Sequence, residues 1–169
     1  MARVKATDPQ ITEMLPQKMA VVRTVGDPNV VGQGAMGALY GSVYTLKFAL
    51  KKQGKEFKVP ALRARWPDLP STPKDQWTGI WGLAVPEDTE TLPQKVPGTE
   101  VKLETWDYGT VAQVLHLGAY SEEGPTVERL HTFIAENGYS LAGVHEEEYL
   151  TPPGSKVQKT IIRYPVTRS

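Results

Sequence analysis

The chain has 169 residues, and its 19 basic and 19 acidic side chains cancel to a formal net charge of zero. This balance excludes the strong electrostatic footprint of proteins that bind nucleic acid or anionic membranes. Cysteine is absent, which excludes disulfides, thiolate nucleophiles and cysteine-ligated zinc.

The length and the hydropathy of the chain favour a soluble protein. A chain of this size forms one large domain or two smaller halves that share a core. Residues 1–15 contain no apolar run of the kind found in signal peptides. No segment approaches the ~20 apolar residues of a membrane span. We therefore expect a cytoplasmic protein with no membrane partner and no direct binding to nucleic acid.

The first half of the chain predicts a strand, a helix and two further strands. The first strand is an apolar, β-branched run that stops at the turn residues Gly26-Asp27-Pro28. Apolar residues then recur at helical spacing up to a point just before Gly54. We expect Gly32-Gln33-Gly34 to form a loop ahead of this helix, not a phosphate cradle, because no lysine-serine pair follows. The four predicted elements are a strand at 19–25, a helix at 35–52 and strands at 57–66 and 77–85.

The second half repeats this order. The turn Asp107-Tyr108-Gly109 separates two β-rich stretches, which form either a hairpin or one long bent strand. A helix is expected between Pro125, which suits its first turn, and Gly138, which suits its end. The predicted elements are strands at 101–106 and 110–120, a helix from about 125 to 137, and strands at 140–150 and 157–166.

Two copies of a strand-helix-strand-strand unit predict an α+β fold. We expect tandem β-α-β-β units with pseudo-twofold symmetry, built on mainly antiparallel sheets with the helices on one side. The halves are expected at about 17–86 and 100–167, joined by a linker at 87–99. Neither half can bury its sheet alone, so a ligand cleft is expected between them.

The segment His145–Leu150 carries the most informative pattern. Alternate side chains of a strand share a face, so His145, Glu147 and Tyr149 point one way. Their neighbours Glu146, Glu148 and Leu150 then point the other way. A face with an imidazole, a carboxylate and a phenol suits contact with a ligand. The alternative is an edge strand whose acidic residues prevent aggregation.

Several segments, taken in order, resemble the GyrI-like domain from about residue 17 to 167. They are Val114–Tyr120, Asn137-Gly138-Tyr139 and Glu147-Glu148-Tyr149. This domain is also the effector-binding module of multidrug-responsive regulators, so the resemblance implies a small-molecule ligand and a ligand-binding role for Glu147. Further segments resemble the stand-alone members of the family, some of which are cyclopropanoid cyclopropyl hydrolases. These segments are Leu39–Lys47, Pro125-Thr126-Val127 and Lys159–Arg163.

One departure from this branch bears on catalysis. The branch usually carries Leu-Glu-Gly followed by an aromatic pair, whereas this chain has Leu62-Arg63-Ala64-Arg65-Trp66. If the missing glutamate takes part in hydrolysis, the protein binds its ligand without turning it over. Burial would raise the pKa of an isolated Glu147, and Arg63 in the same cleft would oppose that shift.

Three functions follow as hypotheses. The first is a stand-alone binder of amphipathic or aromatic compounds, cationic ones included, in sensing, sequestration or detoxification. The second is a cyclopropanoid cyclopropyl hydrolase in which Glu147 activates water. The third is a protein-interaction role such as gyrase inhibition.

Aromatic and charged side chains make up the expected site. Planar ligands need aromatic walls, and a cation needs a counter-charge. We expect no cofactor and no metal, since the three histidines show no close pair; His116 and His131 are expected to be structural. The predicted ligand-binding residues are Tyr40, Tyr44, Arg63, Trp66, Trp81, Glu147 and Tyr149, with Trp77 as a further ring and Glu147 as the catalytic group of an enzyme.

Overall fold

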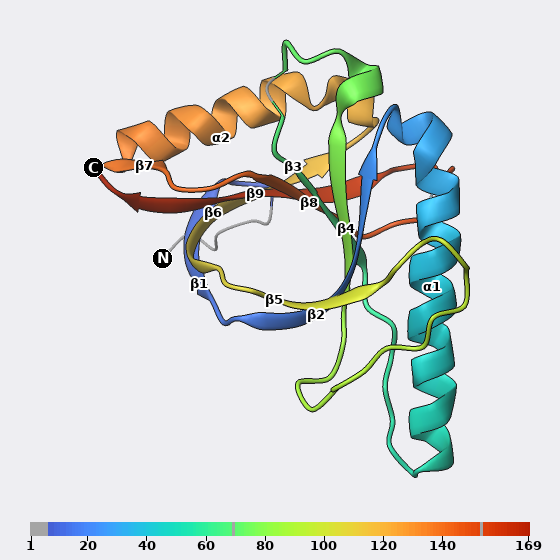
Figure 1. Ribbon diagram of the computed structural model, residues 1–169. Coiled ribbons are helices and arrows are strands. Elements are labelled where there is room, and N and C mark those ends of the chain that lie inside the picture. Colours follow the sequence, from blue (N-terminus) through green and yellow to red (C-terminus); the bar gives the residue numbers. More distant parts are fainter. Residues whose placement is uncertain (1–6, 69, 153) are drawn as a thin grey trace. The chain divides into compact units, whose positions relative to one another are not determined.

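A computed structural model describes residues 7–68, 70–152 and 154–169 (Figure 1). The chain divides into two compact units, Pro16–Asp107 and a second that combines Met1–Leu15 with Tyr108–Ser169. Each unit holds an antiparallel sheet and a helix, which confirms the predicted α+β class and the repeated strand-helix-strand-strand order.

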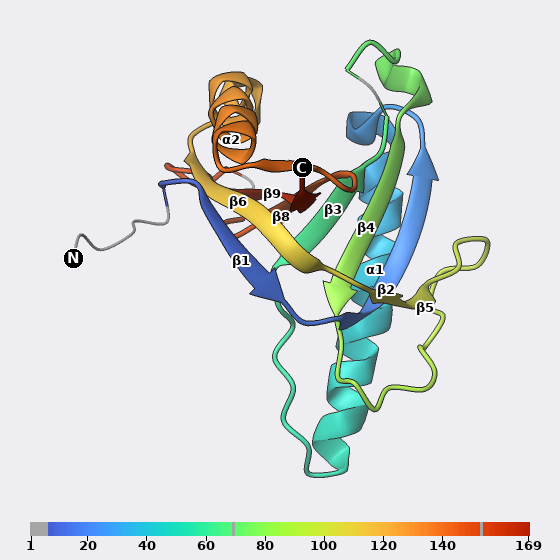
Figure 2. The same cartoon turned by 90° about the vertical axis from the view of Figure 1, so that its left-hand side faces the viewer.

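The unit Pro16–Asp107 is a four-stranded antiparallel sheet with one long helix beside it (Figure 2). Its strands lie in the order β3-β4-β2-β5, and the helix contacts β2 and β4. Its elements are β2 (Gln17–Val25), α1 (Pro28–Lys52), β3 (Leu62–Trp66), the single-turn helix η1 (Lys74–Gln76), β4 (Thr78–Ala84) and β5 (Lys102–Trp106).

Helix α1 begins earlier than the sequence predicts. The Asp27 side chain caps it by accepting a hydrogen bond from the backbone N–H of Asn29 at 2.9 Å, and Pro28 occupies the first turn. The run Gly32-Gln33-Gly34 therefore lies within the helix, and the expectation of a loop there is wrong. The helix carries four glycines in all, with Gly37 and Gly41 following these two. Its capping signals and its packing prevail over the low helix propensity of glycine.

Two strand predictions in this unit need correction. The strand expected at 57–66 is only Leu62–Trp66, because the part that contains Pro60 does not join the sheet. The stretch 101–106 was expected to form a hairpin or one bent strand with 110–120. Its strand β5 pairs with β2, so the hairpin is wrong.

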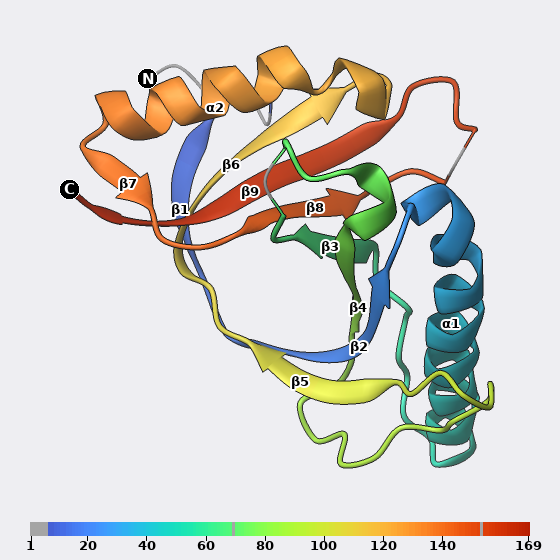
Figure 3. The ribbon, with the colours of Figure 1, turned by 45° about the horizontal axis from the view of Figure 1, so that its top comes forward.

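The second unit is a four-stranded antiparallel sheet covered by α2 (Figure 3). Its strand order is β1-β6-β9-β8, and β7 pairs with the far end of β9. The elements are β1 (Gln10–Met14), β6 (Gly109–Leu117), the single-turn helix η2 (Tyr120–Glu122), α2 (Gly124–Glu136), β7 (Tyr139–Leu141), β8 (His145–Tyr149) and β9 (Lys159–Arg168).

A compact apolar core lies between α2 and this sheet. Leu130 and Ile134 of α2 are buried against apolar side chains of β6 and β9. The buried members on the sheet are Ala112, Val114, Ile162, Tyr164 and Val166. The apolar stripe of the helix therefore fixes α2 over β6 and β9.

Two features of this sheet were not predicted. Strand β1 lies in the polar segment that gave no strand signal, and it pairs with β6. The single strand expected at 140–150 is split into β7 and β8, because the chain passes closely over Pro165. A Cβ atom at Gly143 would lie 2.7 Å from the Pro165 ring, so only glycine fits there. Among the described residues, no helix is both long and apolar enough to span a membrane.

Candidate functional site

One face of β8 carries a chain of short hydrogen bonds. Nε2 of His145 lies 2.5 Å from a carboxylate oxygen of Glu147, two residues along the strand. On the neighbouring strand β9, the Tyr164 hydroxyl lies 2.6 Å from Nδ1 of the same imidazole. Both side chains of β8 thus share the face that strand alternation assigns to them.

A second carboxyl group meets Glu147 from outside the strand. Glu123 precedes α2 directly, and its side chain is hydrogen-bonded to that of Glu147. The Oε2 atom of Glu123 is buried and has no hydrogen-bond partner among the described residues. Sequence reasoning missed Glu123; its place just before the helix was visible, but its contact with a strand 24 positions later was not.

The two carboxyl groups have opposite pKa shifts. Burial, followed by the hydrogen bond with Glu147 and the negative charge of that group, raises the pKa of Glu123 to about 9. Burial also acts to raise the pKa of Glu147, but hydrogen bonds with His145 and Glu123, the charge that His145 carries when protonated, and a hydrogen bond with Tyr149 outweigh burial and lower it. At neutral pH the pair therefore holds one proton, on Glu123, and one negative charge, on Glu147.

This assignment corrects the expectation for an isolated Glu147. The residue is not isolated, and the carboxyl group with the raised pKa is its neighbour Glu123. An ionised carboxylate can only accept hydrogen bonds. Nε2 of His145 therefore carries the proton of its bond to Glu147, and its Nδ1 is free to accept from Tyr164 when the imidazole is neutral.

Phenol rings surround the carboxyl pair. The rings of Tyr120 and Tyr149 meet edge to face with centroids 5.6 Å apart. Burial, followed by the negative charges of Glu147 and Glu123, raises the pKa of Tyr120 and raises that of Tyr164 to about 12. These hydroxyls therefore stay protonated at neutral pH and can donate hydrogen bonds.

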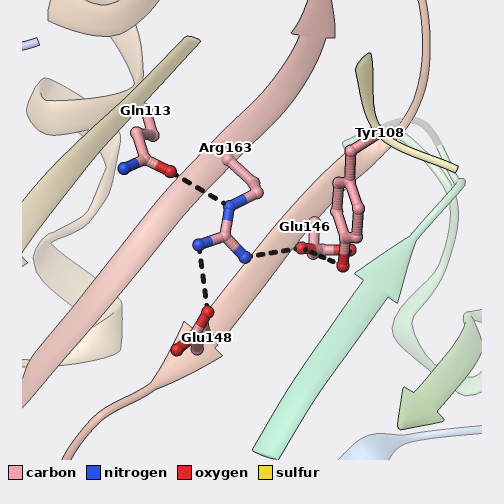
Figure 4. A network of polar contacts seen from close by, with 5 residues as sticks. All are labelled: Tyr108, Gln113, Glu146, Glu148 and Arg163. Carbon is pink, nitrogen blue, oxygen red and sulfur yellow. Dashed lines mark hydrogen bonds and ion pairs between the residues drawn. The ribbon is translucent and has the colours of Figure 1, made fainter. Parts of the chain in front are cut away.

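The opposite face of β8 carries an ionic network (Figure 4). The Arg163 guanidinium donates to Glu146 at 2.7 Å, to Glu148 at 3.0 Å and to the side-chain oxygen of Gln113 at 3.3 Å. The Tyr108 hydroxyl donates to the Glu146 carboxylate at 3.0 Å. Burial lowers the pKa of Arg163, but the two carboxylates outweigh burial and raise it.

The unit Pro16–Asp107 groups its predicted site residues in two aromatic clusters. On α1, the rings of Tyr40 and Tyr44 stack with centroids 6.2 Å apart. In the sheet, Trp66 meets Trp81 edge to face at 5.0 Å and Trp77 at 6.1 Å. The indole N–H of Trp81 donates to Thr24 at 3.0 Å.

The remaining predicted site residue of this unit is a cation. Arg63 lies on β3, opposite Gly82 of β4. The predicted site residues thus fall into four places: the Tyr40–Tyr44 pair, the tryptophan cluster, Arg63, and Glu147 with Tyr149 on β8. A ligand role for all of them stays a prediction.

A candidate set of metal ligands is also present, made up of Glu123, His145 and Glu147. One ligand atom from each lies within 4.8 Å of the others. This set consists of one imidazole and two carboxylates, so it does not require the close histidine pair that the sequence lacks. Glu147 already hydrogen-bonds both His145 and Glu123. His116, as expected, is structural: its ring nitrogens lie 2.7 Å from the Thr126 hydroxyl and 3.0 Å from the Ala119 carbonyl.

Comparisons with known proteins agree with this architecture. The sequence matches the GyrI-like small molecule binding domain over residues 7–165. No curated protein matches the chain at a significant level.

Solved structures resemble it over nearly the whole length. An uncharacterised conserved protein from Listeria innocua is 25% identical with a TM-score of 0.84, over 95% of this chain and 93% of that chain. A hydrolase from Listeria innocua is 25% identical with a TM-score of 0.79, over 95% and 92% of the two chains. The EcmrR C-terminal domain, at 14% identity and a TM-score of 0.60 over 96% and 98%, shares the fold. With the family match covering most of its residues, this chain belongs to the GyrI-like family of small-molecule-binding domains.

Proposed function

We propose that the protein binds amphipathic aromatic compounds that carry one positive charge, in sensing, sequestration or detoxification. The observation that carries this proposal is the carboxyl pair of Glu123 and Glu147. The pair holds one negative charge in a largely buried place, because Glu147 is 7% exposed and ionised while Glu123 keeps its proton. A ligand with one positive charge would neutralise that charge, and a dication or a neutral compound would not.

Aromatic rings next to the charge support the same ligand class. Tyr120 and Tyr149 present phenol rings beside the pair, and a ring face attracts a cation as well as a planar apolar group. Glu123 also has a buried carboxyl oxygen that lacks a hydrogen-bond partner in the described part of the chain, and this oxygen can accept a hydrogen bond from an ammonium group. This oxygen gives the proposed ligand a second polar contact.

The test is binding of a planar monocationic dye, rhodamine 6G, against the neutral dye Nile red, measured by fluorescence anisotropy. We expect Glu147→Gln to lower the affinity for rhodamine 6G about tenfold or more, which is ~1.4 kcal/mol of binding free energy. The affinity for Nile red should remain almost unchanged. Glu128→Gln, at an exposed position on α2, is the matched control. Equal binding of rhodamine 6G by the wild type and Glu147→Gln would contradict the proposal.

A hydrolytic activity is the second candidate, because two of the similar solved structures, at 25% identity, are of proteins named as hydrolases. The carboxyl pair suits this chemistry: Glu147 is an ionised base, and Glu123 is a protonated acid in contact with it. In a cyclopropane conjugated to a dienone, the water oxygen would attack a ring carbon while Glu147 takes its proton. The broken C–C bond would send its electron pair to the carbonyl oxygen, which becomes a phenolate and accepts a proton from a neighbouring donor.

Product formation from a cyclopropanoid substrate tests this candidate. Glu147→Gln should abolish turnover, and Glu123→Gln should reduce it while leaving some substrate binding. The control is again Glu128→Gln. If the Glu147→Gln variant still turns over the substrate, Glu147 is not the catalytic base.

A further inference from the structure

The ionic network on the second face of β8 is too costly to be explained by stability. Arg163 is 3% exposed and Glu146 is 2% exposed, so both charges have lost nearly all of their water. Desolvating such a pair costs about as much as the ion pair returns, and apolar side chains of similar volume often give equal or greater stability. The network therefore calls for a role other than stability.

The ionic network holds both neighbours of Glu147 on β8. Glu146 and Glu148 stand on either side of Glu147 along β8, and the fork of Arg163 binds both of them. A guanidinium is rigid and planar, so two simultaneous bonds fix the separation and the direction of the two carboxylates. The backbone between them, which carries Glu147, is fixed as a result.

The same two strands join the network to the carboxyl pair. In the register of β8 and β9, Glu146 stands opposite Arg163, and Glu147 stands opposite Ile162. Tyr164, which follows Arg163 on β9, points to the other face of the sheet, where its hydroxyl lies 2.6 Å from Nδ1 of His145. A slip by one residue would exchange the two faces of β8, which would take Glu147 away from Glu123 and His145 away from Tyr164.

We propose that Arg163, with Glu146 and Glu148, is a positioning group that holds Glu147 against Glu123 and His145. This inference rests on the proposed function of the carboxyl pair. The three residues do not touch the ligand; they act through β8. Tyr108 and Gln113 assist by completing the hydrogen bonds of Glu146 and Arg163.

The experiment replaces the network by neutral side chains. The triple variant Arg163→Met/Glu146→Gln/Glu148→Gln removes all three charges of the network together, so it is expected to fold with a melting temperature close to that of the wild type. Rhodamine 6G should bind it at least about tenfold more weakly. The carboxyl ¹³C signals of Glu123 and Glu147, assigned with Glu123→Gln and Glu147→Gln, should lose their separated titrations and move toward ordinary glutamate behaviour.

Two milder variants protect the test against a failure to fold. Tyr108→Phe removes one donor from Glu146, and Glu148→Gln keeps an acceptor for Arg163; both should show a small shift in the titration of the carboxyl pair. A folded triple variant, or folded milder variants, with wild-type titration and dye affinity would overturn the proposal. Loss of dye binding in the triple variant with an unchanged titration would also overturn it.

The outcome also separates this inference from the proposed function. If Glu147→Gln binds rhodamine 6G as the wild type does, the proposed function fails. The carboxyl titration needs no ligand, so it still tests whether Arg163 positions Glu147. Glu128→Gln serves as the control in both measurements.

Discussion

The two faces of β8 each bring two glutamates together, but they manage the excess negative charge differently. On one face, Glu146 and Glu148 bind the guanidinium of Arg163. On the other face, Glu123 and Glu147 meet, and a proton on Glu123 removes one of the two charges. The same residue type is therefore held in place by a fixed cation on one face and by an exchangeable proton on the other.

Removing the cation should have the largest effect. Arg163→Met removes the buried ion pair with Glu146, and breaking a buried ion pair by removing one partner costs about 3–5 kcal/mol. We expect the free energy of unfolding in urea to fall by roughly this amount. The triple variant described above should recover most of the loss. Equal stability of the single variant and the wild type would show that the ion pairs are not held in solution.

Removing the exchangeable proton should change the pH dependence of stability. An unfolded glutamate releases its proton near the ordinary pKa of 4.5, whereas folded Glu123 keeps its proton up to about pH 9. Between these values the folded state binds more protons than the unfolded state, so the free energy of unfolding falls as pH rises. The slope is at most ~1.4 kcal/mol per pH unit, and partial exposure of Glu123 reduces it.

Glu123→Gln should remove this decline, and Glu128→Gln should retain it. The measurement is urea unfolding at a series of pH values from about 5 to about 9. Parallel curves for Glu123→Gln and the wild type would mean that Glu123 does not hold a proton in this range.

The smallest expected effect concerns a cation in the other unit. By sequence resemblance, Arg63 stands where the cyclopropanoid hydrolase branch usually has a glutamate, so under the hydrolase hypothesis Arg63→Glu should raise turnover of a cyclopropanoid substrate by about tenfold, or ~1.4 kcal/mol. Lys52→Glu, at an exposed position at the end of α1, is the matched charge reversal. Unchanged turnover in Arg63→Glu would show that this position takes no part in the chemistry.

Local patterns were sufficient to predict most of the architecture. Alternation assigned the side chains of β8 to their faces, and apolar periodicity located both helices. Prediction was weaker where local signals compete, as at the start of α1. There, capping by Asp27 extends the helix through glycines that suggested a loop.

The missed parts of the candidate site depend on contacts that are distant in sequence. Glu147 was identified from its own strand, but the proton-bearing partner Glu123 comes from the start of α2. The bond between Tyr164 and His145 depends on the register of β8 and β9. A strand pattern gives the direction of a side chain, but it does not give the identity of the side chain that it meets.

The four glycines of α1 have a consequence for motion. Each glycine inside a helix loses more conformational freedom on folding than alanine, at a cost of about 0.5–1 kcal/mol, so four of them weaken α1 by roughly 2–4 kcal/mol. Among the described residues outside the helix's own backbone, no atom lies within 4 Å of a Cβ built on Gly34 or Gly37, so close packing does not require glycine at these two positions. The buried residues of α1 all lie between Gly32 and Val43, whereas positions 44–52 are exposed or half-buried. Packing therefore holds the glycine-containing part of the helix, and backbone amides of its last turns should exchange with solvent hydrogen sooner.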